Sequence, residues 1–92
     1  MTSEKIKAAI VIYRQFFEQQ GIEKAEYSRD ELLPSPKLGL PHCHGMLDKM
    51  EEFLERGRRG KAMRWLCFIQ GCLWSNGYLT IGQLADHNRK EE

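Results

Sequence analysis

Apolar side chains recur every three or four residues over several stretches of this chain, which is the spacing of an amphipathic helix. The first such stretch covers residues 3–20. Ser3 or Thr2 can cap its start, and Gly21 is a natural stop after its end. The apolar face of this stretch comprises Ile6, Ala9, Ile10, Tyr13, Phe16 and Phe17. We therefore expect a long first helix over residues 3–20.

Two more long helices are expected in the second half of the chain, over residues 41–56 and 61–76. The proline that begins the first of them is tolerated in the opening turn of a helix. The connection between these helices is so short that they must be antiparallel neighbours. A last, shorter helix is expected over residues 80–87, because Thr80 and Gln83 have the spacing of a capping box.

The segment between the first and second long helices is less regular. Ser28 and Glu31 also have capping-box spacing, which predicts a short helical turn over residues 28–33. All three prolines of the chain fall within residues 33–41. Proline lacks a backbone donor and biases the preceding residue away from helix, so this stretch is expected to be a loop.

These patterns predict an all-α fold, a small antiparallel helical bundle of about four helices with a proline-containing loop between the first and second long helices. Residues 1–92 are expected to form a single domain. The 41% of hydrophobic and 29% of charged residues are typical of a globular chain. A chain this short buries little surface, so the helices must pack well or subunits must associate.

The net charge and the number of cysteines indicate which partners and which cell compartment to expect. The formal net charge is +1, which gives no global field that would favour nucleic acid or an anionic membrane. Lys7 and Arg14 interrupt the first apolar stretch, so neither a signal peptide nor a membrane span is expected. The odd number of cysteines, Cys43, Cys67 and Cys72, argues against a disulfide framework. We therefore expect a cytoplasmic protein.

The predicted helix over residues 61–76 is apolar nearly all round, so it should be buried or shared with a partner. Gln70 projects among apolar neighbours and is expected to be buried with hydrogen-bond partners, in a structural role that joins two helices rather than in ligand contact. Phe68 and Gly71 instead lie on the polar stripe. Either a second copy or another partner covers Phe68, or the first or last helix of the same chain does.

The most suggestive polar feature is a run of five cations where the second long helix ends and the third begins. We call this run the basic turn; it comprises Arg56, Arg58, Arg59, Lys61 and Arg64. Free amides at the start of a helix, with cations nearby, suit a phosphate or a carboxylate. Alternatively the cations stabilise the end of the preceding helix and are otherwise solvated, with Glu51, Glu52 and Glu55 neutralising part of their charge.

The run His42, Cys43 and His44 contains the residue types that bind zinc. Adjacent residues on a helix point about 100° apart and seldom share an ion, and the usual paired-ligand spacings are absent. We therefore expect no metal and no cofactor, and interpret these side chains as packing groups. A small metal-dependent or cysteine enzyme built around them is the least favoured of three hypotheses.

Residues 58–89 resemble the C-terminal part of small phage and prophage proteins of unassigned function. The residues that carry the resemblance are Lys61 to Leu66, Phe68 to Gly71, Leu73, Trp74, Thr80, Ile81, Leu84 and His87 to Arg89. The resemblance covers about a third of the chain. It implies a phage-type accessory protein that acts in the host cytoplasm by binding a host or defence component, and it carries over no catalytic residues.

The leading expectation is therefore a non-catalytic protein, forming a homodimer or higher oligomer, that binds a host protein or protein complex. The second hypothesis is a nucleic-acid or nucleotide-binding module that uses the basic turn. No membrane association is expected. The expected binding residues are Arg56, Arg58, Arg59, Lys61, Arg64, Phe68 and Gln70.

Overall fold

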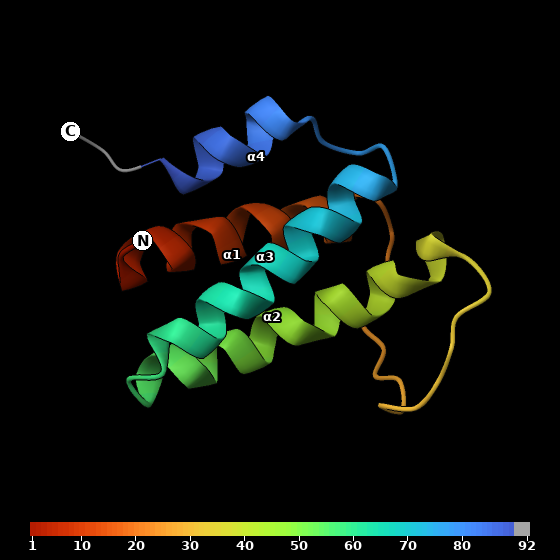
Figure 1. The fold of residues 1–92 in the computed structure, drawn as a ribbon, viewed down its shortest axis with the longest axis horizontal. Coiled ribbons are helices and arrows are strands. Elements are labelled where there is room, and N and C mark those ends of the chain that lie inside the picture. Colours follow the sequence, from red (N-terminus) through yellow and green to blue (C-terminus); the bar gives the residue numbers. More distant parts are fainter. Residues whose placement is uncertain (90–92) are drawn as a thin grey trace.

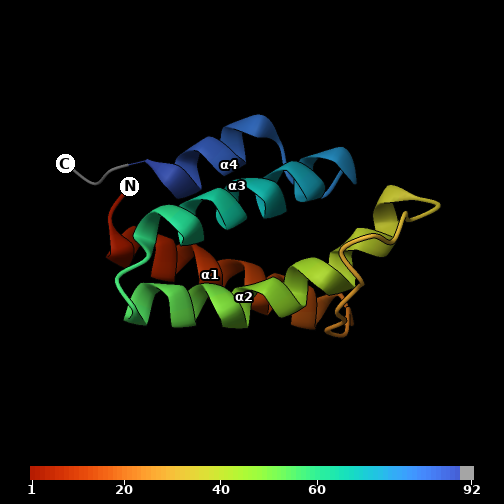
Figure 2. The same ribbon diagram turned by 60° about the horizontal axis from the view of Figure 1, so that its bottom comes forward.

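The computed structural model describes residues 1–89, which form four α-helices and one short 3-10 helix. The α-helices are α1 (Ser3–Gln19), α2 (Leu40–Glu55), α3 (Arg59–Ser75) and α4 (Ile81–Asn88), and the 3-10 helix is η1 (Pro36–Gly39). Helices α2 and α3 form an antiparallel hairpin, α1 packs against both of them, and α4 packs against α1 (Figure 1 and Figure 2). The predicted all-α bundle is confirmed.

The ends of the first and last helices follow from their capping residues. The hydroxyl of Thr2 accepts a hydrogen bond from the backbone N–H of Lys5 at 3.1 Å, so Thr2 rather than Ser3 caps α1. At the start of α4 the predicted capping box is formed. The hydroxyl of Thr80 accepts from the N–H of Gln83 at 3.0 Å, and the N–H of Thr80 donates to the Gln83 side chain at 2.9 Å.

The connection between α1 and α2 differs from the prediction. The expected helical turn over residues 28–33 is only a hydrogen-bonded turn, in which the N–H of Glu31 donates to the carbonyl of Ser28 at 3.1 Å. Pro34 and Pro36 follow within a few residues and prevent a helix from continuing. The helical turn forms instead at η1, inside the predicted loop. Pro36 is well suited to open such a turn because its φ is already fixed near helical values.

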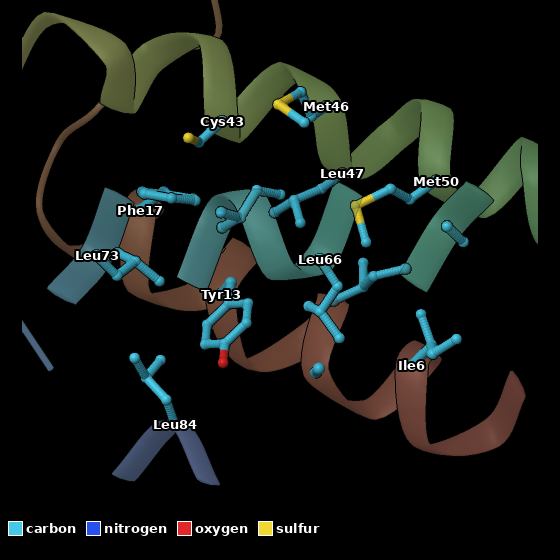
Figure 3. Close-up of a cluster of buried hydrophobic side chains, with 14 of the residues drawn as sticks. Ile6, Tyr13, Phe17, Cys43, Met46, Leu47, Met50, Leu66, Leu73 and Leu84 are labelled. Atoms are coloured by element: carbon cyan, nitrogen blue, oxygen red, sulfur yellow. The ribbon is translucent and has the colours of Figure 1, made fainter. Parts of the chain in front are cut away.

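Side chains from all four α-helices meet in one core, shown in Figure 3. Its fully buried members include Tyr13 and Phe17 from α1, Leu47 and Met50 from α2, and Leu66 from α3. Truncation of a buried leucine in such a core costs about 2–5 kcal/mol of stability. None of the helices in the described range is long and apolar enough to cross a bilayer.

Helix α3 is less enclosed than its sequence predicts. Its inner positions are fully buried, but Phe68 and Trp74 remain 56% and 54% exposed. Nothing lies within 4 Å of the position that a Cβ would take at Gly71. Helices α1 and α4 pack elsewhere, so the alternative in which one of them covers Phe68 is wrong. Within residues 1–89 this face of α3 is open.

Candidate functional site

The basic turn lies at one end of the bundle, where Arg56 and Arg58 connect α2 to α3 and Arg59, Lys61 and Arg64 belong to the first two turns of α3. Gly57 reverses the chain there with a φ of +74°, in the left-handed region that glycine adopts without strain. The N–H of Arg58 then donates to the carbonyl of Phe53 at 2.7 Å and closes the turn. Figure 1 and Figure 2 show that the chain's N-terminus lies at the same end.

Among residues 1–89, the cations of the basic turn have no acidic partner. Within residues 1–89, none of the five lies within 4.0 Å of a carboxylate oxygen. Glu51, one of the acids expected to neutralise the turn, instead pairs with Arg14 of α1. Asp48 likewise accepts from Arg14 and from Lys24, each at 2.8 Å. The acids of α2 that form ion pairs hold α1 and the following loop, and no acid in the described part of the chain neutralises the turn.

Aromatic rings support two of these cations. Phe53 and Trp65 pack edge to face with their ring centroids 4.8 Å apart. The ammonium of Lys61 lies 4.6 Å from the centroid of Phe53 and 5.9 Å from that of Trp65, and the guanidinium of Arg58 lies 5.7 Å from Phe53. Such contacts stabilise a cation without consuming its hydrogen-bond donors. Lys61 and Arg58 are therefore held in place and still free to bind an anion.

The start of α3 adds to the positive potential. Arg58 precedes the helix, and no side chain caps its first turn. Free amides at a helix start attract negative charge, although this effect is confined to the first turn. Arg59 also has a structural contact, since its guanidinium donates to the carbonyl of Met1 at 2.9 Å.

Gln70 lies away from the basic turn, in a buried polar network. The residue is 6% exposed, as predicted. Its amide nitrogen donates to the hydroxyl of Tyr13 at 2.9 Å and to Asn88 at 2.7 Å, and its oxygen accepts from the Asn88 amide at 3.0 Å. The Tyr13 hydroxyl lies 2.8 Å from Nδ1 of His87. The network joins α1, α3 and α4, one helix more than the sequence indicates.

Burial changes the pKa of Tyr13, the phenol in this network. It raises the pKa of Tyr13 above the ordinary value of 10.0, and the hydrogen bond from Gln70 offsets this only in part. Tyr13 is therefore neutral and serves as a hydrogen-bonding group in the core. All the contacts of Gln70 are internal to the fold.

The two histidines singled out in the sequence hold different parts of the connecting loop. Nδ1 of His42 accepts from the N–H of Tyr27 at 3.3 Å, and the two rings stack. His44 is buried, and its Nδ1 donates to the carbonyl of Ile22 at 2.7 Å. In the part of the chain that the structure describes, no group of three or more His, Cys, Asp or Glu side chains is arranged to hold a metal ion.

The third member of that run, Cys43, contacts a residue that the sequence does not connect with it. Its thiol is buried and interacts with the thiol of Cys72 on α3. The interaction between the two thiols lowers the pKa of Cys72 to about 7, while the same interaction and burial raise the pKa of Cys43. Cys72 is thus a thiolate in part at neutral pH, which is the nucleophilic form of a cysteine.

Two hollows lie beside α2, where the loop after α1 folds back along it. The first, of about 310 Å³, is lined by Lys24, Ala25, Glu26, His42, Gly45, Met46, Asp48, Lys49 and Trp65. The second, of about 280 Å³, is lined by Tyr27, Ser28, Arg29, Glu31, Leu33, Gly39, His42 and Phe68. Phe68 is therefore the one expected binding residue that lines either hollow.

Sequence reasoning missed these hollows because they depend on a contact between distant main-chain groups. The N–H of Ala25 donates to the carbonyl of Pro41 at 3.0 Å. A Cβ at Gly45 would lie 2.9 Å from the carbonyl oxygen of Ala25, so only glycine permits this approach. A glycine inside a helical pattern is the available sign of such a contact, but it does not say which segment approaches.

Comparison of the chain with protein-family models, with curated proteins and with solved structures found no match.

Proposed function

We propose that this protein is a non-catalytic binding protein that docks an acidic surface of a partner protein through the basic turn. The observation that carries the proposal is the concentration of five cations without carboxylate partners at one end of the bundle, within the described residues. Complementary charge steers association and favours partners of opposite sign.

The net charge of the chain and the side chains near the basic turn favour a protein partner over nucleic acid. The net charge of the whole chain is only +1, so a long polyanion gains little beyond the turn itself. The charged side chains that line the first neighbouring hollow are balanced, since Lys24 pairs with Asp48 and Lys49 pairs with Glu26. The positive surface that a polyanion needs therefore does not continue from the turn into this hollow. Phe53, Trp65 and Arg58 cluster beside the turn, and aromatic residues and arginine are enriched at protein interfaces.

The resemblance of residues 58–89 to small phage proteins supports a partner from a host cell or its defence systems, bound in the cytoplasm. Such proteins commonly act by occupying a surface of the partner. Four of the five cations of the basic turn, Arg58, Arg59, Lys61 and Arg64, lie at the start of the resembling segment.

The proposal is tested by affinity capture with the tagged full-length protein in cells that express it naturally. The test variant combines Arg56→Gln with Arg64→Gln, and the matched control combines Lys7→Gln with Lys37→Gln, which removes two exposed cations outside the turn. The extract is treated with nuclease. We expect the wild type and the control to retain the same acidic protein, and the test variant to retain about tenfold less, or ~1.4 kcal/mol.

Equal retention by the test variant would contradict a role for the basic turn. Release of the captured protein by nuclease would contradict a direct protein contact and would favour the nucleic-acid alternative.

A further inference from the structure

The two hollows beside α2 share His42 as a lining residue, and we call them together the groove. We propose that the groove binds a short peptide segment of the acidic partner, with large apolar side chains in the hollows and carboxylates against the basic turn. This inference rests on the proposed function and adds the chemistry of the segment that is recognised.

The floor of the groove is one face of α2. His42 and Lys49 lie two turns apart, with Gly45 and Met46 three and four residues after His42, so these four residues share one face of the helix. Gly45 has no side chain, and the main chain of Ala25 lies directly against it, which brings the loop after α1 close to this row. Met46 is almost completely buried beneath it, and a methionine side chain adapts readily to the shape of an apolar group that binds over it.

The walls come from elements far apart in the sequence. On one side, Trp65 and Phe68 lie about one turn apart on α3, and Phe68 is 56% exposed and so accessible to a ligand. On the other side lies the loop after α1, where Ala25 and Tyr27 contribute. Hollows of about 310 and 280 Å³ lie near the lower limit for ligand sites, so each suits one or two side chains of a peptide.

The charges indicate which peptide fits. Most charged side chains that line the first hollow are already paired across it. The pairs are Lys24 with Asp48 at 2.8 Å and Lys49 with Glu26 at 2.6 Å. The unpaired positive charge begins where the groove reaches Trp65, because Lys61 lies against that ring and Arg64 precedes it in the helix. A segment whose apolar residue contacts Trp65 therefore places its neighbouring residues beside cations, which favours aspartate or glutamate there.

The probe for this proposal is a phage-displayed library of random 12-residue peptides, selected against the immobilised full-length protein. The strongest peptides are then synthesised with a fluorophore, and their binding is measured by anisotropy. We expect the selected sequences to combine at least two Asp or Glu residues with a large apolar residue. We expect Phe68→Ala to weaken binding about tenfold and Trp65→Ala to weaken it more.

Trp74→Ala is the matched control, because Trp74 is an equally exposed aromatic residue of α3 that lines neither hollow. It should leave the affinity unchanged. Thermal melting by circular dichroism verifies that each variant is folded. Phe68→Ala is the decisive variant if loss of the contact with Phe53 destabilises Trp65→Ala.

A second pair of substitutions, Lys61→Gln with Arg64→Gln, separates this inference from the proposed function. If these changes weaken binding and reduce its salt dependence while Phe68→Ala and Trp65→Ala have no effect, the groove is overturned and the basic turn stands. If only the groove variants weaken binding, the peptide is not held by the turn and the proposed function falls.

Selected peptides without acidic residues would also overturn the inference. So would a wild-type dimer in light scattering that Phe68→Glu converts to monomers, because the groove would then be filled by a second copy of the chain.

Discussion

Replacing Gln70 by leucine removes the amide that joins α1, α3 and α4. The amide makes three hydrogen bonds, two to Asn88 and one to Tyr13. Each buried hydrogen bond contributes about 0.5–1.5 kcal/mol, so their loss costs about 1.5–4.5 kcal/mol. Leucine recovers about 1 kcal/mol by burying more apolar surface. We therefore expect the free energy of unfolding to fall by about 2 kcal/mol.

The assay is urea denaturation followed by circular dichroism, with thermal melting beside it. For a chain of this size, 2 kcal/mol corresponds to a fall in Tm of about 8–16 °C. The matched control is Gln15→Leu at an exposed position of α1, which should change stability by less than about 0.5 kcal/mol. A double-mutant cycle with Tyr13→Phe should show coupling, because the two side chains contact each other directly. If Gln70→Leu proves as stable as the wild type, the network does not hold the three helices together.

Three further predictions concern packing and titration. Gly45→Ala should destabilise the protein by about 1–3 kcal/mol, because the new Cβ would meet the Ala25 carbonyl. Gly71→Ala has open space around it and should stabilise the protein by about 0.5–1 kcal/mol. The midpoints of urea denaturation compare the two variants. Alkylation of Cys72 by iodoacetamide, followed by mass spectrometry, should reach half its maximal rate near pH 7, and a midpoint near 9 would contradict the contact between the thiols. The pKa of Tyr13 is raised in the folded state, so its contribution to stability is complete below pH 10 and is lost as the pH rises through the folded pKa. We therefore expect the wild type to lose more stability than Tyr13→Phe between pH 9 and pH 11.5, as measured by urea denaturation at each pH.

The long helices were predictable because apolar spacing and capping residues are local properties. Gln70 could be placed in the core for the same reason, since its neighbours on the helix face are apolar. The turn at Ser28 was wrongly predicted as helical because a capping pattern favours a helix start without requiring that a helix follow. The prolines after it, and the fixed φ of Pro36, determined where the helical turn forms.

The remaining features depend on contacts across the chain. The approach of Ala25 to Gly45 creates the first hollow, and the thiol contact joins Cys43 to Cys72 on another helix. Neither pairing has a local pattern that identifies it. For a similar reason, the sequence could not decide whether Phe68 is exposed. It shows an aromatic residue on the polar stripe of the helix but not which helices pack beside it.

The position of Trp65 allows binding to be followed by intrinsic tryptophan fluorescence. Its indole lies between the basic turn and the groove, in contact with Lys61 on one side and lining the first hollow on the other. The chain has only one other tryptophan, Trp74, which lines neither hollow. A Trp74→Phe protein would therefore emit from a single indole at the proposed contact surface. Its emission wavelength and quenching by iodide would distinguish partners that cover the groove from those that contact only distant surfaces.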